Sequence, residues 1–145
     1  MESIKDMLIE HEDLKLVVYD DATGLPITKG TVVKGNPTIG VGRNLVGRGI
    51  TKDEAMYLLD NDIADFQHQL FVKLPWFYSK PVEVQAVLTD MGFNLGVAGL
   101  LSFKNTLHFI EIGNYKAAAE NMLDSRWARQ VGDRADKLSN ILKSL

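Results

Sequence analysis

The chain lacks several features that whole classes of protein require. It contains no cysteine, which excludes disulfide bridges, thiol catalysis and cysteine metal sites. The absence of cysteine also fits folding in a reducing cytoplasm. Residues 1–6 have neither the basic nor the apolar region of a secretory signal, and we expect no apolar run long enough to span a bilayer. These absences predict a protein made in the cytoplasm that is not inserted into a membrane.

An excess of positive charge is also missing. The chain has 16 Lys and Arg residues against 19 Asp and Glu residues, a net charge of −3. Nucleic-acid binding rewards a basic surface, so we do not expect a nucleic-acid partner. The histidines at 11, 68 and 108 do not have the spacing of metal ligands, and residues 40–42 lack the third glycine of a dinucleotide fingerprint. We therefore expect neither a metal nor a cofactor.

The residues that are present indicate an α+β fold that is mostly helical. The 145 residues, of which 46% are hydrophobic, suit one domain or two small lobes that share a core. Residues 14–50 are rich in Gly, Thr and Val and predict short strands and turns. From residue 51 onward, apolar residues recur at helical spacing. The predicted organisation is therefore a small strand-containing lobe followed by helices.

The helical part begins with a capping box. Thr51 and Glu54 stand at its two positions, and they predict a long helix over about 52–70. Pro81 is expected at the first position of a second helix, and apolar residues through Leu95 give that helix a broad core face. Three shorter helices are predicted at 103–110, 115–123 and 134–142. We expect a single domain, 1–145, with a β-containing lobe at 13–50, a connecting helix at 51–70 and a helical lobe at 71–145 that packs with helix 3–12.

A carboxylate interrupts the apolar stripe of the first predicted helix. Ile4 and Leu8 continue by one turn to Glu12, where an apolar residue is expected. Burial on this face and the C-terminal end of the helix would both raise the pKa of Glu12. A carboxylic acid that stays protonated near neutral pH can donate a proton to a leaving group. A lone glutamate at a helix end is more often simply solvated, so a functional role for Glu12 requires partner residues nearby.

A second carboxylate and a hydroxyl group come soon after Glu12 in the chain. Asp21 lies at the mouth of a glycine-rich segment, and Thr38 begins the apolar stretch after it. Two carboxylates beside a cleft are typical of glycoside hydrolysis, and a threonine hydroxyl can hold a water molecule. Asp20 is adjacent to Asp21, but neighbouring residues of a strand point to opposite faces. Only one of the two can therefore serve the cleft.

The order of these motifs along the chain resembles the phage-type lysozymes, glycoside hydrolase family 24. The resemblance covers almost the whole chain and rests on the segments 12–21, 38–42, 49–55, 93–96, 99–103, 125–130 and 134–135. It implies a lysozyme-like, two-lobed fold. It also implies that Glu12 is the general acid, that Asp21 activates the hydrolytic water and that Thr38 positions this water. Family members of this type usually invert the anomeric centre.

The same resemblance assigns the wall of the cleft. Leu45, Phe93, Thr106 and Asn121 match family positions that bind substrate, and Arg134 matches an arginine that lies near the catalytic acid and would lower its pKa. From the residues alone, Phe93 fits a core position equally well. Thr106 and Asn121 fit ordinary surface positions equally well, and Trp127 fits a packing anchor better than a sugar platform.

Two departures from the family pattern stand near these residues. The segment 25–37 is longer than the family's short form and is interpreted as an inserted hairpin or flap that covers substrate, narrows specificity or blocks the cleft. Arg43 stands where many members have a histidine, so a salt bridge that depends on that histidine is lost or replaced.

The expected activity is that of an endolysin-type muramidase. Its partner would be the glycan strands of peptidoglycan, cleaved at the β-1,4 bond between N-acetylmuramic acid and N-acetylglucosamine. We expect a monomer, made in the host bacterial cytoplasm and carried to the cell wall by a separate release system. The alternative is a catalytically silent lysozyme fold that binds peptidoglycan or a protein. Intact Glu12, Asp21 and Thr38 argue against it, whereas the insertion favours it.

Overall fold

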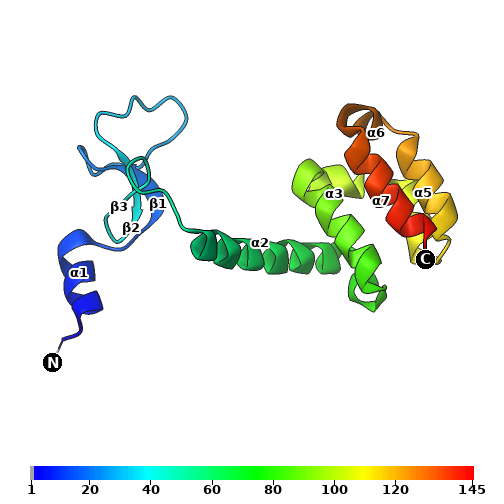
Figure 1. Cartoon of the computed structure of the whole chain (residues 1–145), viewed down its shortest axis with the longest axis horizontal. Helices are drawn as coiled ribbons and strands as arrows, with labels where there is room; N and C mark the ends of the chain where they lie inside the picture. Colours follow the sequence, from blue (N-terminus) through cyan, green and yellow to red (C-terminus); the bar gives the residue numbers. More distant parts are fainter. Residues whose placement is uncertain (1) are drawn as a thin grey trace. The chain divides into compact units, whose positions relative to one another are not determined.

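The computed structural model describes residues 2–145 and divides the chain into two compact units, Met1–Tyr57 and Leu58–Leu145 (Figure 1). Within the described residues it contains seven α-helices, one short 3-10 helix and a three-stranded antiparallel sheet. The mostly helical α+β fold is therefore confirmed. The boundary between the units falls inside helix α2 (Lys52–Lys73), about two turns into the helix that was predicted to connect the lobes.

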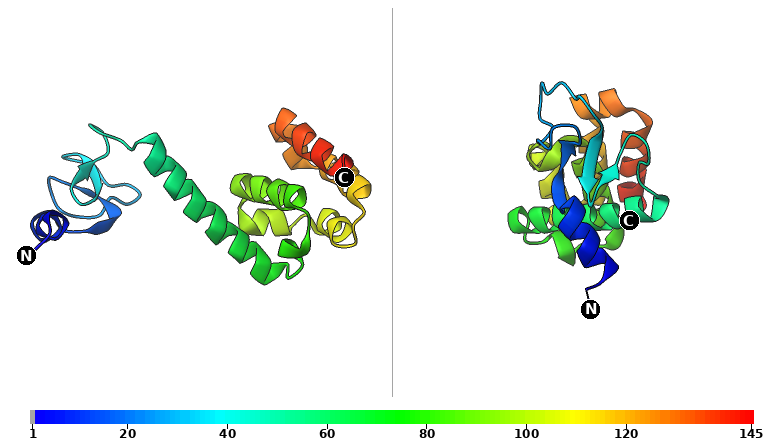
Figure 2. Two further views of the ribbon diagram at one scale, coloured as in Figure 1. Left: turned by 60° about the horizontal axis from the view of Figure 1, so that its bottom comes forward. Right: turned by 90° about the vertical axis from the view of Figure 1, so that its left-hand side faces the viewer.

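The first unit contains helix α1 (Ile4–Glu12) and the sheet, formed by strands β1 (Lys15–Asp20), β2 (Pro37–Gly40) and β3 (Arg43–Asn44) in that order. Both pairs of strands are antiparallel, as the right-hand view of Figure 2 shows. Tyr19 is paired with Thr38, and Asp20 with Pro37. This register brings the end of β1 next to the start of β2. The residues around Asp21 and those around Thr38 therefore meet at one edge of the sheet.

Helix α1 begins as the sequence predicts but buries none of its residues. The Ser3 hydroxyl accepts a hydrogen bond from the Asp6 amide and donates one to the Asp6 carboxylate, 2.8 Å away, which is the expected cap. The apolar residues of the stripe are all exposed, and so is Glu12. Within the first unit nothing described covers this face, so burial of Glu12 on an apolar face stays a prediction. Packing of the helix against the helical lobe stays a prediction.

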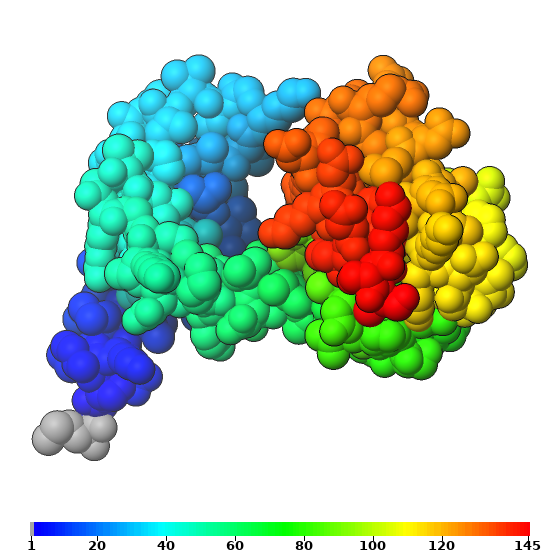
Figure 3. Space-filling model, turned by 45° about the vertical axis from the view of Figure 1, so that its right-hand side comes forward, coloured from blue at the N-terminus to red at the C-terminus, as the bar shows by residue number. Residues whose placement is uncertain are grey.

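The inserted segment between β1 and β2 is an ordered flap without a strand of its own. Pro26 forms an isolated bridge with Tyr19, and the Ile27 amide donates to the Val18 carbonyl at 3.0 Å. Farther along, Thr28 and Thr31 close a turn through their hydroxyl groups. Atoms of this segment, coloured light blue in Figure 3, lie at the surface of the first unit. Of the two interpretations, an inserted hairpin or a flap, the absence of a strand among the described residues between β1 and β2 favours the flap.

The second unit is formed by the rest of α2 and the elements that follow it. These are the 3-10 helix η1 (Phe77–Ser79) and the helices α3 (Val82–Leu101), α4 (Lys104–Glu111), α5 (Tyr115–Leu123), α6 (Arg126–Val131) and α7 (Asp133–Lys143). Helix α6 was not predicted from the sequence, and it is only six residues long. Its start has a recognisable signal, because the Ser125 hydroxyl accepts a hydrogen bond from the Ala128 amide.

Helix α3 is the centre of the core, as its apolar face predicts. Val84, Val87, Leu88 and Met91 are completely buried. The helix continues beyond Leu95 to Leu101 but is broken at Gly96, whose φ of 76° and ψ of 166° are not helical. Glycine adopts this conformation without steric cost. The two segments therefore pack as a bent core helix.

The length and hydropathy of α3 correct one expectation from the sequence. By these two measures alone the 20 residues of this helix are sufficient to cross a membrane, and no such segment was anticipated. Core helices of globular proteins pass the same test, because burial also requires apolar side chains. The buried face of α3 packs against α7 and the rest of the helical unit, which explains its hydropathy without a membrane.

The capping box at the start of α2 is confirmed, and it is joined by Arg43. The Glu54 carboxylate accepts a hydrogen bond from the Thr51 amide at 2.8 Å, and the Thr51 hydroxyl accepts one from the Glu54 amide. The Arg43 guanidinium forms a two-pronged ion pair with Glu54, with distances of 2.7 and 2.6 Å, and donates to the Gly49 carbonyl. The salt bridge at this position is therefore replaced, with arginine as the cation.

Glu54→Gln is expected to lower the melting temperature at pH 7 by about 2–4 °C. The Thr51 amide, the Thr51 hydroxyl and the Arg43 guanidinium hold the pKa of Glu54 below its ordinary value of 4.5. The stabilisation is therefore complete above pH 4.5 and is lost as the pH falls through the lowered pKa of the folded state. Thermal melts from pH 7 to pH 3 should show a smaller acid dependence for the variant. Equal acid dependence in both proteins would contradict this assignment.

Candidate active site

Asp20 and Asp21 occupy different environments, as predicted, although Asp20 ends β1 and Asp21 already lies in the turn after it. The Asp20 side chain is only 2% exposed, and its carboxylate accepts hydrogen bonds from the backbone N–H groups of Lys34 at 2.7 Å and of Ala22 and Gly35 at 3.0 Å. The Lys34 amide contributes most to holding the pKa of Asp20 below its ordinary value, and burial opposes this shift. Asp20 therefore closes the flap and is not available to a substrate.

Asp21 is exposed, and among the described residues its carboxylate accepts hydrogen bonds only from Asn36. One carboxylate oxygen accepts the Asn36 backbone N–H at 2.6 Å, and the other accepts the side-chain amide at 3.3 Å. The Asp21 amide donates in turn to the Asn36 carbonyl at 3.1 Å. Gly35 packs so closely against Asp21 that a side-chain carbon there would collide with the carboxylate. The Asp21 carboxylate is thus fixed in orientation while remaining open to solvent.

Thr38 lies on β2 and is only 3% exposed. Its hydroxyl donates to the Asn36 carbonyl at 2.9 Å. Because the hydroxyl hydrogen is used in this bond, the Thr38 oxygen can only accept a hydrogen bond from a bound group. A water molecule beside it must therefore donate one hydrogen to Thr38.

The Glu12 carboxylate lies against the turn that follows β2. An ideal side-chain carbon at Gly42 would be 3.0 Å from the Glu12 Oε2 atom, and Gly42 has a φ of 68°. Both the backbone conformation and the close approach favour glycine here. The first unit therefore contains all three predicted catalytic residues. Asp21 and Thr38 meet where β1 ends and β2 begins, whereas Glu12 lies toward the other end of this strand pair, beside Gly42.

Leu45 belongs to the same unit and directly follows β3. It is half-buried, and its amide donates to the Pro37 carbonyl at 2.9 Å. This bond ties Leu45 to the segment that carries Thr38. Its contact with a substrate stays a prediction.

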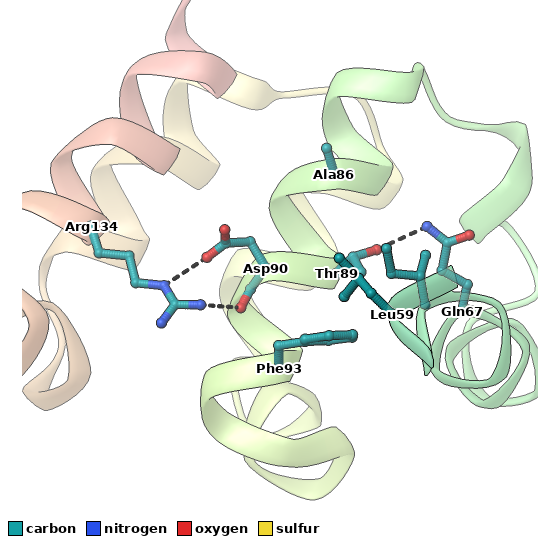
Figure 4. A pocket seen from close by; sticks show the side chains of 8 residues that line it. Leu59, Gln67, Ala86, Thr89, Asp90, Phe93 and Arg134 are labelled. Atoms are coloured by element: carbon teal, nitrogen blue, oxygen red, sulfur yellow. Dashed lines mark hydrogen bonds and ion pairs between the residues drawn. The ribbon is translucent and has the colours of Figure 1, made fainter. Parts of the chain in front are cut away.

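Phe93 lies on the surface of the second unit and is not a core residue. Its side chain is 46% exposed, and its ring meets that of Phe66 edge to face at 5.6 Å. Figure 4 shows Phe93 beside a cavity of about 350 Å³ whose lining also includes Thr89, Asp90 and Arg134. The core interpretation of Phe93 is therefore wrong, and an aromatic face remains available at the surface.

Arg134 forms an ion pair within the second unit. Its Nε donates to the Asp90 carboxylate at 2.7 Å, and its NH2 group donates to the Asp90 carbonyl at 3.0 Å. Figure 4 shows both bonds bridging from α7 to α3. No pattern in the sequence indicated Asp90 as the partner. The expected position of Arg134 near Glu12 stays a prediction.

Thr106 and Asn121 contact each other, with their side-chain oxygens 2.6 Å apart. Thr106 is only 1% exposed, whereas Asn121 is half-buried. Thr106 is therefore not a surface polar residue, and its hydroxyl donates to the Asn121 oxygen. This bond leaves the Asn121 NH₂ group as the donor that an incoming ligand can reach.

Trp127 is a packing anchor, as the sequence favours. It is buried, its ring meets that of Phe103 edge to face at 5.9 Å, and its N–H donates to the Asn94 side chain at 2.6 Å. Among the residues that sequence reasoning missed, Asn36 is the most important for the site. Its position directly before Pro37, which predicts extended backbone, was the only local signal.

The chain is similar in sequence to a known protein family and to several known proteins. The profile of the family described as phage lysozyme matches residues 10–142. The chain is 30% identical over 157 residues to the pre-baseplate central spike protein Gp5 of Enterobacteria phage T4, an alignment that covers 97% of this chain but 27% of that protein. This chain thus spans about a quarter of the length of the spike protein.

Two further relatives are similar over nearly their full length, and both come from Dictyostelium discoideum. Probable T4-type lysozyme 1 is 27% identical over 161 residues, with 98% of this chain and 94% of that protein covered. Probable T4-type lysozyme 2 is 24% identical over 172 residues, with the same shares covered.

Proposed function

Because the chain belongs to the phage lysozyme family, we propose that it is a muramidase that hydrolyses the β-1,4 bond between N-acetylmuramic acid and N-acetylglucosamine in bacterial peptidoglycan. The family match and the T4-type lysozyme relatives support a lysozyme-type glycosidase. The observation that carries the finer proposal is the joint attachment of Asp21 and Thr38 to Asn36. This arrangement fixes a carboxylate and a hydroxyl oxygen as two acceptors for one water molecule.

In the proposed reaction the water donates one hydrogen to Thr38 and the other to Asp21. A lone pair of the water oxygen attacks the anomeric carbon, and the Asp21 carboxylate takes up the proton as the new carbon–oxygen bond forms. Attack on the face opposite to the leaving group inverts the anomeric centre. Thr38 suits this role because its hydroxyl hydrogen is already bonded to the Asn36 carbonyl.

Glu12 supplies the proton for the other half of the reaction. As the bond between the anomeric carbon and the glycosidic oxygen breaks, the Glu12 carboxylic acid protonates this oxygen and becomes a carboxylate. The net proton transfer is from water to Asp21 and from Glu12 to the departing sugar. Proton exchange with solvent then removes the proton from Asp21 and returns one to Glu12. The small Gly42 beside Glu12 leaves the carboxyl group free to approach the substrate.

Product analysis of digested peptidoglycan tests this proposal. The wild-type protein should release soluble fragments whose new reducing ends are N-acetylmuramic acid, as mass spectrometry would show, and proton NMR of the first product should show the inverted α-anomer. Reducing ends on N-acetylglucosamine, or free stem peptides, would reject a muramidase. Binding to insoluble peptidoglycan without release of fragments would favour the silent-module alternative.

Thr106→Val is expected to raise the KM for peptidoglycan about three- to tenfold, through loss of one orienting hydrogen bond. We propose that Asn121 presents its NH₂ group to a carbonyl of the substrate, and Thr106 fixes the orientation of that amide. Thr106→Ser keeps the hydroxyl and should retain the wild-type KM. A KM that is unchanged in the valine variant would remove Thr106 from this role.

We propose that the protein is made in the bacterial cytoplasm, reaches the wall through a separate release system and acts as a monomer. Fractionation of producing cells before and after the membrane is made permeable would test its location. Cell-wall association in intact cells would contradict it. The similarity to a baseplate spike protein offers a second setting, in which the protein would be found in purified virus particles.

A further inference from the structure

Asn36 forms hydrogen bonds with both members of the proposed water-binding pair, Asp21 and Thr38. Its backbone N–H and its side-chain amide donate to the two oxygens of the Asp21 carboxylate. Its carbonyl accepts hydrogen bonds from both the Asp21 amide and the Thr38 hydroxyl. Four hydrogen bonds thus meet on a single residue, and a shift of Asn36 would move the carboxylate and the hydroxyl together.

Attachment of the flap does not depend on the Asn36 side chain. The returning end of the flap is held by Asp20, whose carboxylate accepts the backbone N–H groups of Lys34 and Gly35. The Asn36 side chain has a different partner, the exposed carboxylate of Asp21. Pro37 also restricts the backbone of Asn36 to extended conformations, which fixes the direction of its carbonyl.

We propose that Asn36 is a positioning residue for hydrolysis, which sets the orientation of the Asp21 carboxylate and the Thr38 hydroxyl relative to the attacking water. This inference rests on the proposed function, because it assigns no role to Asn36 apart from the water held by Asp21 and Thr38. Asn36 itself touches neither the proton nor the sugar. Its contribution is to turnover, since positioning of the water matters after the substrate has bound.

The charged groups along this end of the flap define what a substitution at Asn36 would change. The carboxylate of Asp20 is enclosed by backbone amides, and Lys34 is exposed beside it. Asn36 contributes no charge. Asn36→Asp replaces a neutral donor by a carboxylate directly beside Asp21, whereas the backbone bonds of residue 36 are kept. Like charges at this distance disfavour ionisation of both groups, so the pKa of Asp21 should rise.

The experiment compares Asn36→Asp with Thr31→Asp, which adds the same charge to the same flap. Thr31 is exposed, and its oxygen accepts the Thr28 amide, a role that aspartate can keep. The pKa of Asp21 would be followed by carbon-13 NMR of its carboxyl carbon, assigned with Asp21→Asn, and hydrolysis of peptidoglycan would be measured against pH. In Asn36→Asp both the NMR pKa and the acidic limb of kcat should move up by about one pH unit, while Thr31→Asp matches the wild type.

A second variant keeps the test valid if the new charge disturbs the hairpin. Asn36→Ala removes only the side-chain bond to Asp21, and kcat should fall about three- to tenfold with KM unchanged. If the wild type lyses peptidoglycan while both Asn36 variants keep the wild-type kcat and Asp21 pKa, the positioning role is overturned and the proposed function stands. If the NMR pKa shifts but the wild type releases no fragments, the proposed function fails and the role of Asn36 in hydrolysis fails with it.

Discussion

Glu12→Gln is expected to slow the hydrolysis of peptidoglycan about a hundred- to ten-thousand-fold. The amide has nearly the shape of the carboxylic acid but has no proton to give to the departing sugar oxygen. Glu12 is the last residue of α1, is exposed and has Gly42 as its close neighbour. The substitution should therefore leave the fold intact, and binding to insoluble peptidoglycan should persist.

Glu10→Gln is the matched control for this prediction. Glu10 lies on the same helix, is exposed and loses the same charge on substitution. The Glu10→Gln variant should lyse peptidoglycan at the wild-type rate and melt at the same temperature as the wild type. Turbidity loss of a peptidoglycan suspension measures both variants directly. Equal rates for the two variants, whether high or low, would contradict a specific role for Glu12.

The nature of the leaving group provides a sharper test of Glu12 as the acid. In a synthetic chitooligosaccharide with a nitrophenol leaving group, the nitrophenolate departs without being protonated. The general acid therefore contributes little to the cleavage of this substrate. If this substrate is cleaved, the deficit of Glu12→Gln should be much smaller with it than with peptidoglycan. The same large deficit with both substrates would place Glu12 in another role.

The parts of the site that the sequence predicted are those governed by local geometry. Asp20 and Asp21 were expected to point in different directions, and the structure buries the first, at the end of β1, and exposes the second, in the turn that follows. The capping box of Thr51 and Glu54 is likewise a pattern within four residues. Such features depend on dihedral angles that neighbouring residues set for themselves, so a single sequence contains the information.

The parts that were missed depend on contacts between distant residues. Arg134 pairs with Asp90, which lies 44 residues earlier in the sequence. Trp127 donates a hydrogen bond to Asn94, which lies 33 residues earlier. Neither pair has a periodicity that a sequence reveals. The same limit applies to Glu12. The apolar stripe of its helix predicts which face is apolar, but not which part of the protein packs against that face. Asn36 combines both difficulties, because its role follows from the register of β1 and β2, which places it opposite Asp21.

The second large effect is expected at Asp20, where Asp20→Asn should release the flap and lower hydrolysis about tenfold or more. Three backbone N–H groups converge on this carboxylate, those of Ala22, Lys34 and Gly35. Asparagine offers only one oxygen, and its NH₂ group would face a donor. At least one of these amides then loses its acceptor, and the end of the flap that leads to Asn36 is no longer held.

Hydrogen exchange of the three amides measures this release directly. In the wild type they should be protected at neutral pH, and in Asp20→Asn those of Lys34 and Gly35 should exchange quickly. Asp60→Asn removes the same charge from an exposed position on α2 and should leave both protection and activity unchanged. Full protection and full activity in Asp20→Asn would show that the three hydrogen bonds do not hold the flap.

The pH dependence of this protection follows from the direction of the pKa shift. The Lys34 amide, with smaller contributions from those of Ala22 and Gly35, holds the pKa of Asp20 below its ordinary value of 3.8 despite burial. The stabilisation is therefore complete above pH 3.8 and is lost as the pH falls through the lowered pKa of the folded state. Wild-type protection of these amides should disappear in that acidic range, whereas Asp20→Asn should show no such step. Asp21→Asn, in contrast, should abolish hydrolysis while the same amides stay protected, because its carboxylate accepts hydrogen bonds only from Asn36 among the described residues.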